Sequence, residues 1–228
     1  MSLRRAISAV LSGTLVISLM SSVSAKSGPF RYVANSEMKI ALTFDDGPHP
    51  FYTAEILDIL KQYDVKATFF CVGSNAELYP ELIEREIAEG HEIANHTYNH
   101  YHVSKLSGEA LSKDILCCTK TLERISGRKI RFFRPPEGVC NEALKEICEQ
   151  AGMTIVLWSV DTRDWAHTPI NEICQNVKSN ARNGSIILMH DFIGKNSPTP
   201  KALRQIIPML QELGYEMVTV SQLVGEAE

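Results

Sequence analysis

The chain has no Cys-X-X-Cys pair, no internal repeat and no low-complexity stretch. The missing cysteine pairs exclude the common cysteine zinc sites and dithiol redox motifs. Positive charge is not in excess either, because 23 Lys and Arg residues stand against 27 Asp and Glu residues, for a formal net charge of −4. That balance argues against a nucleic-acid partner. The longest mostly apolar segment is also short for a membrane-spanning helix, which needs about 20 residues.

That segment, residues 6–20, has the organisation of a secretory signal peptide. Arg4 and Arg5 precede it, and the small residues 23–25 follow it as a cleavage site. We expect residues 1–25 to be removed and the protein to be exported, to the cell wall or the extracellular space. The mature formal charge would be 21 − 27 = −6. The alternative is a retained membrane anchor, but no basic cluster follows the segment.

The remaining chain is expected to form a single α/β domain at 38–228, after a mostly polar lead-in at 26–37. In a chain of 228 residues that is 44% hydrophobic and 22% charged, one sizeable core is expected. Helical patterns cover Thr53–Tyr63, Pro80–Glu89, Ser107–Ile125, Glu142–Gln150, Pro169–Ala181 and Pro200–Leu213. Apolar β-type runs cover Lys39–Phe44, Ala67–Val72, Glu92–Asn95, Ile130–Phe133, Thr154–Val160, Ser185–Met189 and Tyr215–Thr219. This alternation predicts a distorted β/α barrel of about seven parallel strands rather than an open sheet.

The six cysteines are expected to be mostly buried, reduced thiols. An even number in an exported chain permits disulfides, but the spacing does not define their connectivity. Cys71 lies near the end of a predicted strand, and Cys117, Cys148 and Cys174 lie on helical patterns. A free thiol in such positions behaves as a small apolar side chain.

Two adjacent carboxylates, Asp45 and Asp46, follow the first apolar strand and precede the turn Gly47-Pro48. Ligands bind at strand ends in α/β folds. At a frayed strand end both side chains can turn toward one cavity. Like charges held that close shift each other's pKa unless a cation lies between them. The pair therefore favours a bound metal ion.

His96 and His100 supply the nitrogen ligands that such a site needs. Their i, i+4 spacing would bring both imidazoles to one side of a helical turn. With Asp46 they form a set of two nitrogens and one oxygen, which leaves positions open for water and substrate, as in catalytic zinc sites. The other histidines, His49, His91, His102 and His167, are expected to be ordinary surface or hydrogen-bonded residues.

Five sequence blocks, in order, resemble the polysaccharide deacetylases, the NodB-homology domains of carbohydrate esterase family four. They are Thr43-Phe44-Asp45-Asp46-Gly47-Pro48, His96-Thr97-Tyr98-Asn99-His100, Arg134-Pro135-Pro136-Glu137-Gly138, Asp161-Thr162-Arg163-Asp164-Trp165 and Leu188-Met189-His190. Each block alone is a weak signal, but five in the family's order are hard to obtain by chance. The resemblance implies a distorted barrel of β/α units that hydrolyses N-acetyl or O-acetyl groups of glycans with a divalent metal ion.

The resemblance makes Asp46, His96 and His100 the metal ligands, with Zn²⁺ expected and Co²⁺ or another divalent ion as alternatives. Such an ion lowers the pKa of water and polarises the acetyl carbonyl. Asp45 would be the general base, and Arg134 would orient it and keep it ionised. Taken alone, Arg134 would be an ordinary surface arginine.

The same resemblance makes His190 the general acid that protonates the departing sugar amine or hydroxyl, with Asp164 holding its imidazole. Trp165 and Leu188 would wall the apolar slot for the acetyl methyl, although Trp165 alone would be an ordinary core aromatic. Glu137 stands where the family usually has an aromatic residue. Its backbone N–H can still serve as the oxyanion donor, but its carboxylate is expected to disfavour anionic glycans.

Two other functions stay open. One is a metal-dependent amidohydrolase of the same superfamily that acts on a small cyclic amide, which an assay of acetate release would separate. The other is a glycan-binding protein whose active site has lapsed, although every proposed catalytic side chain is present. The expected partner is an acetylated polysaccharide or oligosaccharide such as peptidoglycan or chitin oligomers, with acetylated xylan also open.

Overall fold

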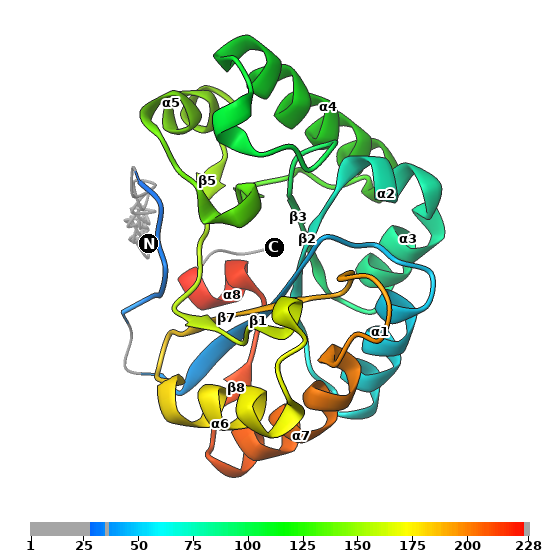
Figure 1. Cartoon of the computed structure of the whole chain (residues 1–228), viewed down its shortest axis with the longest axis vertical. Coiled ribbons are helices and arrows are strands. Elements are labelled where there is room, and N and C mark those ends of the chain that lie inside the picture. Colours follow the sequence, from blue (N-terminus) through cyan, green and yellow to red (C-terminus); the bar gives the residue numbers. More distant parts are fainter. Residues whose placement is uncertain (1–27, 35–36, 226–228) are drawn as a thin grey trace, which may run out of the picture.

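The computed structural model describes residues 28–34 and 37–225 and shows a parallel sheet curled into an incomplete barrel (Figure 1). Its strands are β1 (Lys39–Asp45), β2 (Thr68–Cys71), β3 (Glu92–Asn95), β4 (Phe132–Phe133), β5 (Thr154–Ile155), β6 (Val160–Asp161), β7 (Ile186–His190) and β8 (Glu216–Met217). The order is β5-β4-β3-β2-β1-β7-β6, with β8 paired to the start of β1. All of these pairings are parallel. The predicted distorted β/α barrel is confirmed, with eight strands where seven were expected.

The described part of the chain also has eight α-helices, most of them around the outside of the barrel (Figure 1). They are α1 (Tyr52–Gln62), α2 (Gly73–Leu78), α3 (Pro80–Ala88), α4 (Gly108–Ser126), α5 (Glu142–Gln150), α6 (Ile170–Asn180), α7 (Thr199–Glu212) and α8 (Val220–Val224). The long α4 begins at the N-cap Ser107, which accepts from the Ala110 N–H, and ends at Gly127 with φ 65. All six predicted helices are present, and only the short α2 and α8 were missed.

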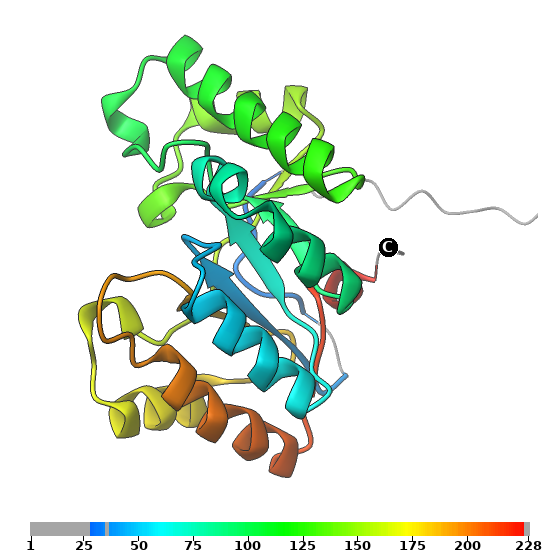
Figure 2. The ribbon, with the colours of Figure 1, turned by 90° about the vertical axis from the view of Figure 1, so that its right-hand side faces the viewer.

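The side chains of β1 alternate between two apolar layers, as the two-residue period of a strand requires. Ile40, Leu42 and Phe44 pack in the larger cluster, between the sheet and the helices. Ala41 faces the inside of the barrel, in a smaller cluster to which α8 contributes Val220. Figure 2 shows α8, in red, at the side of the sheet opposite to that toward which β1 ends. Apolar side chains thus fill the barrel interior, and the carboxyl ends of the strands are left for polar groups.

The single strand expected at 154–160 is wrong, because this segment forms β5 and β6 with a bend between them. The carbonyl oxygens of Val156 and Leu157 accept hydrogen bonds from the Arg134 side chain at 3.1 and 3.2 Å. They are therefore used by a buried cation instead of a neighbouring strand. Among the described residues β5 and β6 are not paired with each other, so the barrel is open here.

Residues 28–34, expected only as part of a polar lead-in, lie across this opening. Phe30 forms a parallel bridge with Val156, and Tyr32 forms an antiparallel bridge with Ser185. Phe30 and Val33 also pack against the inner apolar cluster. The segment therefore links the two sides of the gap in the sheet.

The cysteines are all free thiols, as expected. Cys71, Cys118 and Cys148 are buried, whereas the others are partly or fully exposed. Burial raises the pKa of Cys118 well above its ordinary value and that of Cys148 to about 12. The buried thiols therefore act as small apolar side chains at neutral pH.

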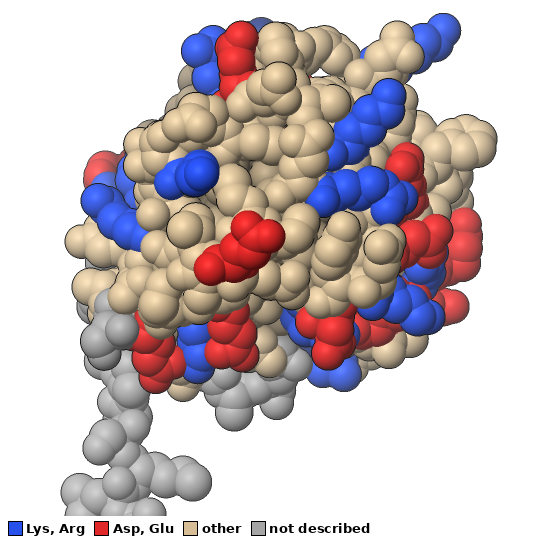
Figure 3. All heavy atoms as spheres, turned by 90° about the horizontal axis from the view of Figure 1, so that it is seen from below, with Lys and Arg blue, Asp and Glu red and all other residues tan. Residues whose placement is uncertain are grey.

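The surface seen in Figure 3 carries Lys and Arg residues interspersed with Asp and Glu, and no continuous basic patch covers this face. Within residues 28–34 and 37–225, no helix combines the length and apolarity needed to cross a membrane. The predicted signal peptide, residues 1–25, lies outside the described residues.

Replacing Gly184 with alanine should destabilise the fold by displacing the docked segment 28–34. Gly184 has φ +79, and an added Cβ would lie 1.6 Å from the Val33 carbonyl oxygen. Gly152 is a matched control, because its φ is +65 but nothing lies within 4 Å of its Cβ position. Both variants carry the left-handed backbone cost of about 1–2 kcal/mol. In urea unfolding, Gly184→Ala should lose about 1–3 kcal/mol more than Gly152→Ala; equal losses would contradict the docking.

Candidate active site

The residues indicated by the sequence converge at the carboxyl ends of the strands. β1 ends at Asp45 and β7 at His190, and the parallel register pairs these two residues directly. His96 follows β3 and Arg134 follows β4, each by one residue. In Figure 2, β1 ends toward the left-hand side, where the loops that follow the strands lie. Active sites of α/β folds occupy this edge of the sheet.

Asp46 leaves β1 in a left-handed conformation, with φ 81. As predicted, the adjacent carboxylates turn toward one point: His96 Nε2 lies 3.3 Å from Asp46 Oδ1 and 3.7 Å from Asp45 Oδ2. The Asn75 side-chain amide donates to the Asp46 carbonyl oxygen at 2.8 Å. A contact from α2 therefore fixes the turn that presents Asp46.

Asp46, His96 and His100 form a compact set of candidate metal ligands, with one ligand atom from each lying within 4.8 Å of the others. His100 Nε2 lies 3.0 Å from Asp46 Oδ1. Burial opposes ionisation of Asp46, but its contacts with His100 and His96 outweigh that effect and hold its pKa well below the usual range. Contact with Asp46 in turn raises the pKa of His100. Two nitrogens and one charged oxygen thus face one point.

The donor set fits a divalent metal ion. Asp46 Oδ1 is buried and makes no hydrogen bond, although the Nε2 atoms of both histidines face it. His96 Nδ1 lies 2.7 Å from the Arg134 carbonyl oxygen. Because a carbonyl oxygen only accepts, Nδ1 carries the proton and the Nε2 lone pair is free for a metal ion. A cation between the three atoms would satisfy the unpartnered oxygen.

The helical turn expected between His96 and His100 is wrong, because this segment is a loop. Thr97 has φ 69 and His100 has φ 55, and neither value is helical. Side chains replace the helical hydrogen bonds: Asn95 Oδ1 accepts from the Thr97 N–H at 2.7 Å, and Asp114 Oδ2 accepts from the Tyr98 N–H at 2.9 Å. The two imidazoles still face the same side, with ring centroids 5.0 Å apart.

Arg134 is fully buried, not the surface residue that its position before two prolines suggests. Its Nη1 donates to Asp45 Oδ1 at 2.6 Å and to Thr43 Oγ1 at 2.9 Å. The guanidinium also lies 3.9 Å from the centroid of the Phe70 ring. Asp45 is 3% exposed, so this charge-assisted pair fixes its carboxylate and leaves Oδ2 facing the metal-ligand set.

On the other side of Asp45, His190 is paired with the buried Asp164. His190 Nδ1 lies 2.8 Å from Asp164 Oδ1, and the His190 backbone N–H donates to Oδ2 at 2.8 Å. Thr199 Oγ1 donates to the same oxygen at 2.6 Å. Burial disfavours the imidazolium, but Asp164, with smaller contributions from Asp45 and the metal-ligand carboxylate, raises the pKa of His190 to about 9. The buried Asp164 thus favours the protonated form of His190.

Glu137 adopts a left-handed conformation with φ 59, and its Oε2 lies 2.7 Å from His102 Nε2. Its negative charge contributes to the raised pKa of His100, which places the carboxylate near the metal-ligand set. His102, expected to be an ordinary histidine, therefore fixes the charged side chain at this edge of the site.

Trp165 and Leu188 differ in exposure. Trp165 is 49% exposed and is not a core aromatic. Leu188 is buried but belongs to neither apolar cluster, and the strand period puts it on the same face as His190. The register also pairs Leu188 with Thr43. These placements are compatible with an apolar wall below His190.

The sequence reasoning overlooked Asp191, which is 1% exposed and directly follows His190. Thr53 Oγ1 donates to Asp191 Oδ2 at 2.5 Å, while Oδ1 has no hydrogen-bond partner. Burial and the charge of Asp46, opposed by the Thr53 hydrogen bond, raise the pKa of Asp191 to about 7. Its position directly after the histidine that ends the last block was the available signal.

Known proteins resemble this chain over most of its length. Residues 33–156 match the family model of polysaccharide deacetylases. A peptidoglycan-N-acetylglucosamine deacetylase of Bacillus cereus is 44% identical, over 84% of this chain and 91% of the relative. A chitooligosaccharide deacetylase of Bradyrhizobium is 36% identical, over 81% of this chain and 90% of the relative.

A solved structure is similarly close. It is a peptidoglycan N-acetylglucosamine deacetylase in complex with 4-naphthalen-1-yl-N-oxidanyl-benzamide, and it matches with a TM-score of 0.83 and 39% identity. The match covers 88% of this chain and 94% of that one. The fold and these relatives define a hydrolase that acts on acetylated sugars. The chain belongs to the polysaccharide deacetylase family.

Replacing Gly47 with alanine should weaken metal binding. An added Cβ would lie 1.9 Å from Asp191 Oδ2, so the turn that carries Asp46 would have to move. A displaced supporting contact costs about 10–100-fold in metal affinity. The control is Gly108→Ala, where nothing lies within 4 Å of the Cβ position. Competition with a zinc chelator measures the affinity; unchanged affinity in Gly47→Ala would contradict this role of the turn.

Proposed function

We propose that the chain is an exported, metal-dependent deacetylase that removes N-acetyl or O-acetyl groups from a glycan such as peptidoglycan or chitin oligomers. The observation that carries the proposal is the juxtaposition of the Asp46, His96 and His100 set with a base and an acid. Asp45 and His190 are direct partners in the β1–β7 register, and both border this set. Residues 1–25 support the proposed export.

Asp45 is the proposed general base. Hydrolysis of an acetyl group requires water to lose a proton as it attacks the carbonyl carbon. A divalent ion bound by the three ligands would lower the pKa of water and polarise the acetyl carbonyl. Asp45 Oδ2 faces this position, while Arg134 holds Oδ1 and orients the carboxylate. The protein's own contribution is thus a fixed proton acceptor beside the attacking oxygen.

His190 is the proposed general acid. An amine leaves poorly unless it is protonated, so a proton donor must lie on the leaving-group side. Asp164 accepts the hydrogen bond of Nδ1–H, which leaves the Nε2 proton available for the departing atom. The raised pKa of His190, about 9, keeps that proton in place at neutral pH. Base and acid thus work from neighbouring strands on opposite sides of the reacting carbon.

Zinc is the proposed metal, since two imidazole nitrogens and one carboxylate oxygen are a donor set of catalytic zinc sites. Cobalt(II) accepts the same donors. The ligand in the related crystal structure is an N-oxidanyl-benzamide, which is a hydroxamic acid and therefore a chelating group. A family member that binds such a group supports a metal site in this family.

The substrate is proposed to be a neutral or cationic amino sugar chain. The relatives include deacetylases of peptidoglycan N-acetylglucosamine and of chitooligosaccharides. Glu137 is exposed beside His100, and its carboxylate repels an anionic group on the neighbouring sugar. This supports N-acetylglucosamine units over sugars that carry a carboxylate.

The proposal predicts that the zinc-loaded protein releases acetate from N-acetylglucosamine oligomers or peptidoglycan fragments. Chelation should abolish release, because the three ligands alone cannot activate water, and Zn²⁺ or Co²⁺ should restore it. Acetate is measured over a panel of glycans that includes acetylated xylan. A protein that releases no acetate but hydrolyses a small cyclic amide would instead be an amidohydrolase, and one that only binds glycans would have a lapsed site.

Two matched variants separate the roles of the adjacent carboxylates in that assay. Asp45→Asn should lose activity but keep its metal, whereas Asp46→Asn should lose the metal itself. Elemental analysis of the purified variants measures the bound ion. Equal metal loss in both would contradict the division of roles.

A further prediction concerns the general acid. His190→Ala should lose on the order of 10²–10⁴ in kcat on an N-acetyl sugar, with unchanged metal content. The loss should be smaller on an activated aryl acetate, because its leaving group needs no proton. Equal losses on the two substrates would show that His190 does not act as the acid.

The pH dependence of kcat tests the same role of His190. Loss of the His190 proton should lower kcat on the alkaline side, at or below pH 9, since a bound divalent cation opposes the raised pKa. Asp164→Asn should move this limb to lower pH by removing the negative partner. A limb that stays in place in Asp164→Asn would contradict the pairing.

A further inference from the structure

Three rings at the rim of the candidate active site form a solvent-facing surface that the proposed mechanism does not use. We call His49, Phe51 and Phe192 the aromatic platform. His49 and Phe192 are stacked, with centroids 4.8 Å apart and planes 12° apart, and Phe51 lies 5.9 Å from His49. Phe51 is 76% exposed and Phe192 is 37% exposed. A group of exposed aromatic side chains of this kind marks an interaction site more often than scattered apolar residues do.

The aromatic platform is held in place from beneath. His49 Nδ1 accepts from the backbone N–H groups of Phe51 and Tyr52 at 3.3 Å each, which caps the start of α1. The His49 ring also stacks on Tyr52, at 5.0 Å between centroids. The Tyr52 hydroxyl accepts from the Ser197 N–H at 3.4 Å and so ties in the loop that carries Phe192. A ligand would therefore meet rings that are already ordered, which lowers the entropy cost of binding.

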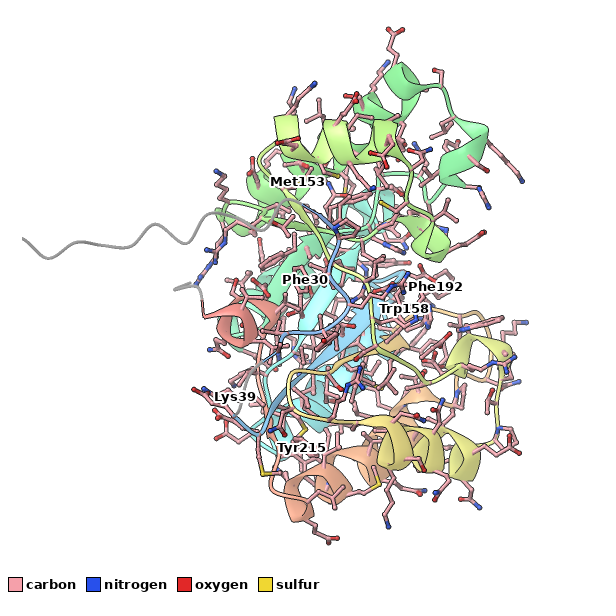
Figure 4. The ribbon with its side chains drawn as sticks, turned by 90° about the vertical axis from the view of Figure 1, so that its left-hand side faces the viewer. Phe30, Lys39, Met153, Trp158, Phe192 and Tyr215 are labelled. Atoms are coloured by element: carbon pink, nitrogen blue, oxygen red, sulfur yellow. The ribbon has the colours of Figure 1, made fainter. Side chains whose placement is uncertain are left out.

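The aromatic platform directly adjoins the proposed catalytic groups. Phe192 lies two residues after His190, and His49 lies three residues after Asp46. The corresponding Cα atoms are therefore within about 8 and 11 Å. Figure 4 shows Phe192 at the right-hand edge of the molecule, the side at which the strands end. The aromatic platform therefore lies beside the proposed catalytic groups.

We propose that the aromatic platform is a sugar subsite that binds the pyranose ring next to the unit that is deacetylated; this inference rests on the proposed function. A pyranose presents an apolar face of C–H groups and an edge of hydroxyl groups. The C–H face is complementary to the negative face of an aromatic ring. Lys195 and Asn196, both exposed in the adjoining loop, supply polar groups at the edge for the hydroxyls.

The test compares acetate release from N-acetylglucosamine and from its oligomers up to the hexasaccharide. In a Phe51→Ala/Phe192→Ala double variant, the gain in kcat/KM from monosaccharide to hexasaccharide should fall about tenfold, mainly through KM. A Phe51→Tyr/Phe192→Trp variant keeps aromatic faces and should retain most of the gain. Leu213→Ala is the matched control, because Leu213 is 43% exposed at the far end of α7 and its loss should leave the gain unchanged.

The possible outcomes separate this inference from the proposed function. If the wild-type protein deacetylates no glycan, the proposed function itself is wrong. If it is active and the double variant keeps the full gain with chain length, only the sugar subsite is overturned. Loss of a concentration-dependent dimer in the double variant, measured by sedimentation with length dependence intact, would show that a second copy covers the aromatic platform instead.

Discussion

The site depends on one buried ion pair, between Arg134 and Asp45. Burying a guanidinium costs free energy unless its donors are paired. Arg134 Nη1 donates to Asp45 and Thr43 on β1, and Nε and Nη2 donate to carbonyl oxygens at the bend after β5. One charge thus orients the proposed base and occupies carbonyls that would otherwise extend the sheet. The Arg134 backbone carbonyl oxygen also accepts from His96 Nδ1 and so sets the tautomer of a proposed metal ligand. Removing this side chain would leave Asp45 charged, buried and unpaired.

Much of the fold could be predicted, because apolar periodicity marks the long helices and the strands β1, β3 and β7, and capping side chains mark the starts of α4 and α5. The short α8 could not, because five residues carry too little periodic signal and only the barrel interior explains why Val220 is buried. The split at 154–160 was equally hidden. The residues of this segment have the pattern of one apolar strand. The bend depends on the Arg134 side chain, more than twenty positions earlier, which binds the carbonyl oxygens at that point.

The residues of the candidate site were found from their blocks, but their backbone was not. Asp46, Thr97, His100 and Glu137 all have positive φ, although none of them is glycine. Side chains support this backbone: Asn75 donates to the Asp46 carbonyl oxygen, Asn95 accepts from the Thr97 N–H, and Asp114 accepts from the Tyr98 N–H in the same loop. Local propensity opposes such conformations, so they persist only where the surrounding structure over-determines them. Spacing alone therefore suggested a helical turn where a strained loop presents the same two imidazoles.

The two proposed proton-transfer groups differ in the sign of the charge that their partners carry. Asp45 and His190 are neighbours in one register, yet Asp45 is paired with a buried cation and His190 with the buried anion Asp164. Asp164 favours the protonated imidazole of His190, whereas Arg134 donates to one oxygen of Asp45 and orients its carboxylate as an acceptor. The proposed assignment of Asp45 as proton acceptor and His190 as proton donor thus follows from which charge each strand neighbour is buried against.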